Sequence, residues 1–239
     1  LRHRLVAGLK SHAEGDRAGR LDLRRLLVVV QVALSVVLLL AAGLLMRTHS
    51  EIRSNDLGFD PRPLSLVTLH IPTLRSSDNT AGFALSNDIV RQVQALPGVE
   101  TAGLAWRVPL SMIQASERFF LPGSDDDIEV AINIVSPEYF EALGLAPLAG
   151  RSLSRDDRLN SPNVVVLNRA AAEQLFARQS PIGQQLSVAA EDIEGGQVQV
   201  VGVVQDSRFA KLADPIRPLI YFPYAQRFRQ RMTLVVRSV

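Results

Sequence analysis

The longest apolar segment of the chain lies near its start, at Leu26–Met46. These 21 residues contain no charged side chain, and Gln31 and Ser35 are the polar interruptions. An α-helix of this length, with a rise of about 1.5 Å per residue, spans the roughly 30 Å hydrocarbon core of a bilayer. Arginines border the segment on both sides. The pattern therefore predicts a transmembrane helix over residues 24–47.

Beyond this segment the apolar positions recur with shorter periods. Residues 64–71 alternate as in a strand with one buried face. Residues 81–96 carry an apolar stripe at helical spacing, and residues 99–108 form a second predicted strand. Together they predict a small strand–helix–strand unit with a right-handed crossover. The stripe consists of Leu85, Ile89, Val93 and Leu96.

The rest of the chain alternates between predicted strands and short helices. Ile128–Val135 predicts a strand, Ser136 and Pro137 the capped start of a short helix, and Gly144 its end. Asn168 is expected to cap a helix over 169–178. We therefore predict an α+β fold after the transmembrane helix, with several strands and three helices. The further strands are expected at 164–167, 186–188, 197–204, 219–222 and 232–236.

Charge is distributed unevenly along the chain. The formal net charge is +2, but residues 1–25 carry seven Lys/Arg against three Asp/Glu, whereas residues 48–239 sum to −3. Short basic flanks of a membrane span stay on the cytoplasmic side. We therefore predict that residues 1–23 are a cytoplasmic basic linker near the membrane lipid and that residues 48–239 are extracytoplasmic. No aromatic residues interleave with the N-terminal basic residues, so nucleic acid is not an expected partner.

A cleaved secretory signal peptide is the competing interpretation of the start of the chain. Ala41, Ala42 and Gly43 supply small residues at which a peptidase could cut. The apolar run, however, is longer than the roughly 7–15 residues of a typical signal-peptide core, and its basic flank is long. These two features favour an uncleaved helix.

The sequence offers little catalytic chemistry. It has no cysteine, which excludes disulfides, thiolate catalysis and cysteine-based zinc sites. Nucleophile elbows, phosphate-binding loops, dinucleotide-binding glycine motifs and zinc-protease helices are absent. The histidines, at positions 3, 12, 49 and 70, fall on both sides of the predicted membrane, and Asp125–Asp127 lack the spacing of a calcium loop. We expect no enzymatic activity, no cofactor and no metal site.

The other carboxylates do not converge on a shared acid–base site by their spacing. Asp206 follows a predicted strand and is expected to cap a turn, and Trp106 is expected in the core. The carboxylates are Glu138, Glu141, Asp156, Asp157, Glu173, Asp206 and Asp214, and the other aromatic residues expected in the core are Tyr139, Phe140, Tyr221, Phe222 and Tyr224.

Several segments occur in an order known from one family of membrane proteins. Arg24–Leu45 resembles the recurring membrane helix of MacB/FtsX-type ABC transporter permeases, and most resembles the duplicated orphan permease branch, in which the permease unit occurs twice. The resemblance covers nearly the whole chain and rests on the ordered set rather than on one motif. The further segments are LGFDP (57–61), LPGVE (96–100), VSPEYFEALGLAPLAGR (135–151), NVVVLNRAAAEQLF (163–176), SPIGQQL (180–186), QVVGVVQDSR (199–208) and PIRPLIYFPYAQ (215–226).

The resemblance implies a MacB-like periplasmic domain with two lobes. A porter-like lobe containing the strand–helix–strand unit would comprise residues 48–110 and 219–239, and an inserted β-rich lobe residues 111–218. The implied function is non-catalytic: part of an export permease of the cytoplasmic (inner) membrane that couples cytoplasmic ATP hydrolysis to periplasmic substrates or partners. The implied partners are the remaining permease helices, a separate ABC ATPase subunit and a periplasmic adaptor.

Compared with a whole permease, the chain begins mid-protein and ends in or just after a strand, so we expect a fragment that lacks the later membrane helices. In a helix bundle, small and polar residues mark the positions where neighbouring helices approach and hydrogen-bond. The predicted helix-packing residues are therefore Gln31, Ser35, Ala41, Ala42 and Gly43.

Two other classes of function fit the same span and charge distribution. One is a single-pass membrane sensor or adaptor with a ligand-binding extracytoplasmic domain. The other is an anchored hydrolase, which turnover of esters, peptides or glycans by residues 48–239 would reveal. Three further apolar spans after Val239 would favour the permease, whereas a signalling module or a stop would favour the sensor.

Overall fold

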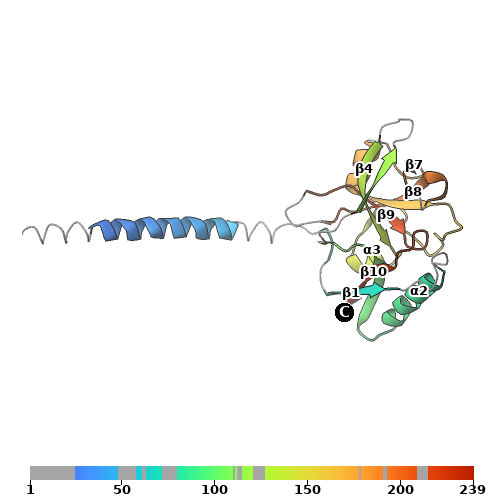
Figure 1. Ribbon diagram of the computed structural model, residues 1–239, viewed down its shortest axis with the longest axis horizontal. Helices are drawn as coiled ribbons and strands as arrows, with labels where there is room; N and C mark the ends of the chain where they lie inside the picture. Colours follow the sequence, from blue (N-terminus) through green and yellow to red (C-terminus); the bar gives the residue numbers. More distant parts are fainter. Residues whose placement is uncertain are drawn as a thin grey trace, which may run out of the picture. The chain divides into compact units, whose positions relative to one another are not determined.

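The computed structural model describes residues 25–47, 58–60, 63–71, 80–109, 111, 115–120, 127–177, 179–190, 193–208 and 215–239. The chain divides into two compact units, Leu1–Asn55 and Asp56–Val239. The first contains a single described helix, Arg25–Arg47, which we call the N-terminal helix (Figure 1). The second unit mixes strands and helices, so the predicted α+β class is confirmed.

Among the described residues of the second unit, six strands pair into a closed ring. Two neighbouring pairs are parallel, β6 with β8 and β4 with β9, and the other four are antiparallel. A short strand, β5 (Pro147–Gly150), pairs with β8 off this path. In order around the ring the strands are β4 (Asp127–Val135), β3 (Ala115–Phe120), β7 (Gln185–Val188), β8 (Gln197–Val204), β6 (Val164–Asn168) and β9 (Leu219–Pro223).

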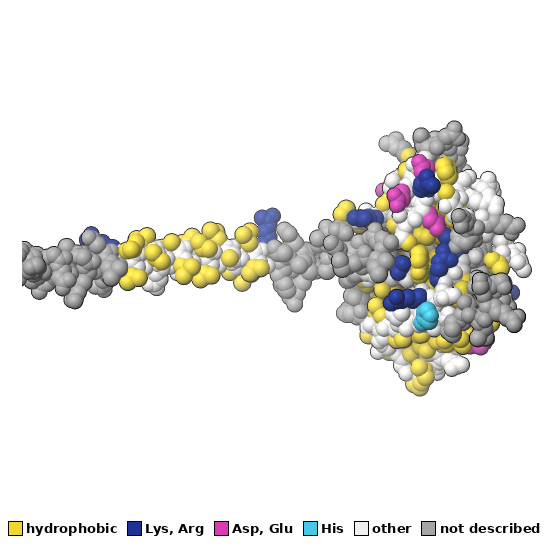
Figure 2. All heavy atoms as spheres, viewed as in Figure 1, with side chains coloured by type: hydrophobic (Ala, Val, Ile, Leu, Met, Phe, Trp, Pro, Cys, Tyr) yellow, Lys and Arg dark blue, Asp and Glu magenta, His cyan; other side chains and the backbone are white. Residues whose placement is uncertain are grey.

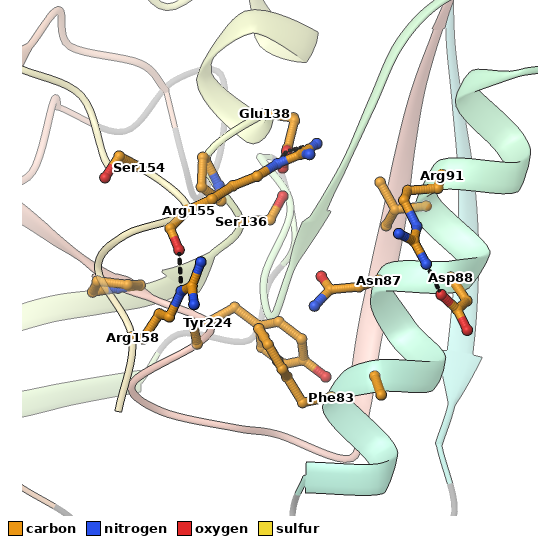
Figure 3. Close-up of a pocket in the computed structure, with 15 residues that line it drawn as sticks. Phe83, Asn87, Asp88, Arg91, Ser136, Glu138, Ser154, Arg155, Arg158 and Tyr224 are labelled. Atoms are coloured by element: carbon orange, nitrogen blue, oxygen red, sulfur yellow. Dashed lines mark hydrogen bonds and ion pairs between the residues drawn. The ribbon is translucent and has the colours of Figure 1, made fainter. Parts of the chain in front are cut away.

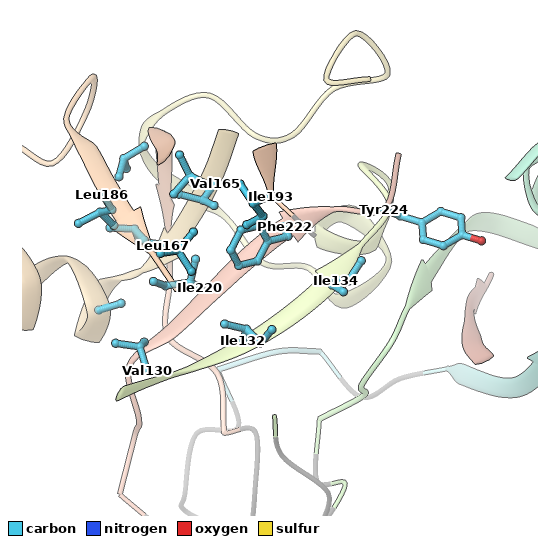
Figure 4. Packing of buried hydrophobic residues seen from close by; sticks show 14 of the residues in the cluster. Val130, Ile132, Ile134, Val165, Leu167, Leu186, Ile193, Ile220, Phe222 and Tyr224 are labelled. Carbon is cyan, nitrogen blue, oxygen red and sulfur yellow. The ribbon is translucent and has the colours of Figure 1, made fainter. Parts of the chain in front are cut away.

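The ring is filled by apolar side chains, as expected for a barrel of few strands. Alternate residues of β4 are buried in one cluster, in agreement with the period-two pattern of this segment. The other strands contribute alternate residues in the same way, and Figure 4 shows these side chains converging. The labelled members from β4, β6 and β9 are Val130, Ile132, Ile134, Val165, Leu167, Ile220 and Phe222.

Three more strands form a smaller sheet at one end of the unit, in the order β1 (Leu64–His70), β10 (Arg231–Ser238) and β2 (Val99–Ala105), and α2 (Thr80–Gln94) contacts β2 (Figure 1). Both pairings are antiparallel, so β1 and β2 run parallel with β10 between them. The predicted strand–helix–strand unit is therefore present with a third strand inserted. Among the described strands, β2 pairs with β4 of the ring through one residue pair, Ala105 with Val135.

The buried face of α2 differs from the predicted apolar stripe. Ile89 and Val93 pack against the core, but Leu85 and Leu96 are 47% and 55% exposed. Two aromatic side chains from the loop after β9 lie against the helix and leave room only for small residues there. The fully buried positions of the helix are Gly82, Ser86 and Val90.

The short helix α3 (Tyr139–Leu143) ends as predicted and begins differently. Gly144 has a left-handed conformation with φ 67°. The prediction that Ser136 caps the helix was wrong, because its hydroxyl accepts a hydrogen bond from the backbone N–H of Leu104 at 2.9 Å. Glu138 occupies the N-cap position without a side-chain bond. Ser136 thus holds the start of this segment against β2.

Helix α4 (Arg169–Phe176) is capped as predicted. The side-chain oxygen of Asn168 accepts hydrogen bonds from the backbone N–H groups of Ala171 and Leu219, both at 2.9 Å. The same side chain donates to the carbonyl of Arg217 at 2.9 Å. Asn168 therefore joins the end of β6 and the start of α4 to β9.

Strand β1 is more exposed than its alternating pattern predicted, and β3 and β5 lie where no strand was predicted. Leu66 and Val67 are exposed, and among the described strands β1 is an edge strand that pairs only with β10. The division into lobes at 110/111 and 218/219 stays a prediction. Because β9 pairs with β4 and β6 of the ring, β9 belongs with the inserted lobe, which is a reason to move the predicted boundary at 218/219 beyond Pro223.

Candidate functional site

The N-terminal helix is a candidate membrane span. The most apolar 18-residue stretch of this 23-residue helix has a mean hydropathy of 2.7, and none of that stretch is buried within the protein. Its length is about 35 Å, more than the hydrocarbon core requires. Figure 2 shows hydrophobic side chains along the whole helix and basic side chains at both ends. A helix that is apolar all round needs either a protein core or a lipid environment.

Three of the predicted helix-packing residues share one face of this helix. At 3.6 residues per turn, Gln31, Ser35 and Ala42 project in nearly the same direction, with Ala41 and Gly43 on either side. The hydroxyl of Ser35 donates to the carbonyl of Gln31 at 2.8 Å, so it is satisfied within the helix. A Cβ added at Gly43 would meet nothing within 4 Å. Their packing role stays a prediction.

The chain joins the second unit at Gly58–Asp60. The backbone N–H of Asp60 donates to the carbonyl of Leu143 at 3.0 Å, at the end of α3. The side-chain amide of Gln205, which follows β8, donates to the carbonyl of Gly58 at 2.9 Å. This segment is therefore attached to two separate elements of the domain.

A buried arginine adds a third attachment. Arg237, near the end of β10, has a side chain only 8% exposed. Its guanidinium donates to the Asp60 carboxylate at 2.9 Å, to the Asp60 carbonyl at 2.9 Å and to the Ala142 carbonyl at 2.8 Å. The planar guanidinium thus binds the incoming segment, α3 and the last strand at once. We call this arrangement of Asp60, Ala142 and Arg237 the arginine junction.

Sequence reasoning missed the arginine junction. Asp60 belongs to the LGFDP segment on which the family resemblance rests, yet no role was assigned to its carboxylate. The available signal was Arg237 itself, a charged residue directly after the predicted strand 232–236. A buried cation within a strand requires a partner, but the sequence does not say which carboxylate supplies it.

The carboxylates considered in the sequence analysis serve separate structural contacts. Glu138 pairs with Arg155 at 2.7 Å. Asp206 accepts a hydrogen bond from the backbone N–H of Ala170 at 2.9 Å, so it caps the start of helix α4 and not the turn that was predicted. Within the described part of the chain, no group of three or more His, Cys, Asp or Glu could hold a metal ion. Several of the carboxylates and histidines considered in the sequence analysis lie outside the described residues: Asp125, Asp126, Asp214, His3, His12 and His49.

Asp157 is the carboxylate with the strongest local support. Its side chain is 6% exposed and accepts two hydrogen bonds from Arg151, at 2.7 and 2.8 Å, and one from the backbone N–H of Ser154 at 2.7 Å. Burial alone would raise the pKa of Asp157, but these hydrogen bonds outweigh it and hold the pKa below its ordinary value. The carboxylate is therefore ionised and fixes the loop that follows β5.

The model of the MacB-like periplasmic core domain family matches residues 26–238. The chain belongs to this family. This MacB-like chain is similar in fold to the periplasmic region of MacB from Actinobacillus actinomycetemcomitans, with a TM-score of 0.51 and 18% identity over 79% of each chain. It is also similar to the extracellular domain of the noncanonic ABC-type transporter YknZ from Gram-positive bacteria, with a TM-score of 0.47 and 17% identity over 73% of this chain and 83% of that one. A search of curated proteins found no match.

The match confirms the predicted MacB/FtsX-like membership. It begins inside the N-terminal helix and ends in β10, so the MacB-like chain is a membrane-helix and domain segment of an ABC transporter permease. The assignment to the duplicated orphan branch stays a prediction.

Proposed function

We propose that this MacB-like chain is the membrane-anchored periplasmic part of an ABC-type export permease. It couples ATP hydrolysis by a separate cytoplasmic ABC ATPase to the handling of a substrate or partner in the periplasm. The N-terminal basic residues lie in the cytoplasm, and the charge asymmetry across the N-terminal helix supports this orientation. The remaining permease helices, membrane lipid and a periplasmic adaptor are its partners, and the domain itself is non-catalytic.

The observation that carries this proposal is the family match across both helix and domain, 26–238. The arginine junction supplies a physical route for coupling. The segment that follows the membrane helix is bound to α3 and β10 through Asp60, whose backbone N–H donates to the Leu143 carbonyl and whose carboxylate and carbonyl accept hydrogen bonds from the charged Arg237. A displacement of Gly58–Asp60 would therefore be passed to the domain rather than absorbed in a loose connection.

The proposal can be tested on the protein purified from its host membranes with the ATPase that accompanies it. Arg237→Met should leave the ATPase bound but change its rate of ATP hydrolysis several-fold, because the junction no longer transmits movement. Arg118→Met, which replaces an exposed arginine on β3, serves as the matched control and should leave the rate unchanged.

Two results would argue against the proposal. If no ABC ATPase accompanies the wild-type protein, the single-pass sensor or adaptor becomes the better account. If the ATPase is bound but its rate is the same in wild type, Arg237→Met and Arg118→Met, the coupling route through the junction is wrong.

A further inference from the structure

A cavity of about 340 Å³ opens at the surface of the domain, and no residue of the arginine junction lines it. Its walls come from α2, the segment before α3, the loop at residues 154–158 and the end of β9 (Figure 3). One wall therefore belongs to the helix of the small sheet, and the others belong to loops of the ring. The volume is at the lower end of the range for small-molecule sites.

The cavity is lined mainly by apolar side chains that are already held in place. The Tyr224 hydroxyl hydrogen-bonds to the Ser86 hydroxyl at 2.8 Å, and burial raises the pKa of Tyr224 to about 12, so the phenol is neutral. The rings of Phe83 and Tyr224 lie 5.5 Å apart between centroids. An apolar ligand would meet a preformed surface of Phe83, Val90, Pro137, Pro223 and Tyr224.

Three arginines line the same cavity, and two of them are neutralised. Arg155 pairs with Glu138 at 2.7 Å, and Arg91 pairs with Asp88 on α2. Figure 3 shows both pairs at the sides of the cavity. These arginines therefore do not leave a net positive charge for a ligand.

The third arginine differs. Arg158 donates through Nε to the carbonyl of Arg155 at 3.1 Å, and its carboxylate contact within the described residues is Asp156 at 4.0 Å. Asp156 is 95% exposed, so this contact is weak. Figure 3 shows the guanidinium of Arg158 and the side-chain amide of Asn87 pointing into the cavity from opposite sides. The cavity thus combines apolar walls with one weakly paired cation and one polar amide.

We propose that this cavity binds a small anionic amphiphile, with an apolar body of aromatic size and a single carboxylate or sulfonate. The apolar body lies against Phe83 and Tyr224, and the anionic group pairs with Arg158 while Asn87 hydrogen-bonds to the ligand. Such a ligand would contact both α2 of the small sheet and the loops of the ring, which the Ala105–Val135 strand pair and the Ser86–Tyr224 hydrogen bond already connect. This inference goes beyond the proposed function, since it concerns binding alone.

The test uses the full chain in lipid nanodiscs and two probes of the same shape, 2-naphthoate and the neutral 2-naphthamide. Saturation-transfer NMR titrations measure binding, and empty nanodiscs correct for partition into lipid. We expect 2-naphthoate to bind more tightly than 2-naphthamide. Equal affinity, or no binding of 2-naphthoate, would overturn the proposal.

Two variants locate the binding. Arg158→Gln should weaken the binding of 2-naphthoate about three- to fivefold, because one exposed ion pair is lost, and should leave the affinity for 2-naphthamide unchanged. Asn87→Trp should fill the cavity and abolish binding of both probes. Arg118→Gln is the matched control, because Arg118 is 67% exposed compared with 72% for Arg158. Unchanged binding of both probes to Asn87→Trp would place the site elsewhere.

Discussion

Single side chains connect parts of this domain that are far apart in the sequence. Arg237 reaches Asp60 across 177 positions, and Asn168 reaches Leu219 across 51. The capping half of the Asn168 interaction is local and was predicted from the residues around it, whereas the partner of Arg237 was not. Local chemistry can be read from the sequence because the backbone fixes it. A partner supplied by the fold cannot be read in this way.

The arginine junction should contribute to stability. Arg237→Met removes three hydrogen bonds that the charged guanidinium donates, and we expect the free energy of unfolding to fall by about 1–3 kcal/mol. For a domain of this size each kcal/mol lowers Tm by roughly 2–4 °C, which thermal unfolding monitored by near-UV circular dichroism would measure. The Tm of Arg237→Lys should fall between those of the wild type and Arg237→Met, because an ammonium group cannot form all the hydrogen bonds of the planar guanidinium. Identical Tm values for all three proteins would contradict the geometry.

Asp157 should make stability depend on pH. Because its folded-state pKa is lowered, its contribution is present above the unfolded pKa of about 3.9 and is lost as pH falls through the folded value. Asp157→Asn should therefore cost about 1 kcal/mol at pH 7, a modest figure because Arg151 is half exposed, and this cost should shrink as the pH falls below about 4. Asp156→Asn is the neighbouring control and should be neutral. A pH-independent difference would show that the carboxylate charge has no role.

At the scale of elements, whether a strand or helix could be predicted from the sequence depended on which side chains bury it. The pattern of β4 is clear because one face fills the ring with branched residues. The buried face of α2 escaped because close packing against aromatic rings requires Gly82 and Ser86, which do not read as apolar. Strand β3, ASERFF, carries charged and polar residues that mask its alternation. Hydrophobic periodicity therefore identifies strands that are buried by large side chains and misses contacts made by small ones.

Gly103 illustrates such a close contact. A Cβ at this position in β2 would lie 2.6 Å from the backbone nitrogen of Tyr139, so β2 and α3 could not keep their separation. Gly103→Ala should destabilise the domain by about 3 kcal/mol, measured by thermal unfolding. Gly82→Ala should cost less, since its nearest neighbour is the edge of the Phe228 ring, which can shift. The reverse order of the two effects would contradict this packing.

The N-terminal helix offers a prediction of a different kind. Gly43→Leu adds an apolar side chain, so membrane insertion should be unchanged, whereas assembly with the other permease helices should be impaired if Gly43 is a packing position. Leu44→Phe, on the side of the helix opposite Gln31, Ser35 and Ala42, is the control. Carbonate extraction measures insertion, and co-purification measures assembly. Normal assembly of Gly43→Leu would reduce the helix to a simple anchor.

At the scale of the whole molecule, the order of short segments predicted more than any single motif. It indicated the family that the match over residues 26–238 confirms, and the fold class with it. The order of segments did not indicate that β9 closes a ring with β4, because parallel pairing of two strands about 88 positions apart leaves no local pattern in the sequence. Nor could it reveal the cavity at Arg158, which is walled by four separate segments.

The account as a whole requires the domain and the basic N-terminal residues to lie on opposite sides of the membrane. The absence of cysteine makes this testable by single-cysteine labelling without background. In spheroplasts, a membrane-impermeant maleimide should label Asp156→Cys, at a 95% exposed position, and should label Ser11→Cys only after lysis. Labelling of Ser11→Cys in intact spheroplasts, with Asp156→Cys protected until lysis, would contradict the proposed periplasmic coupling function.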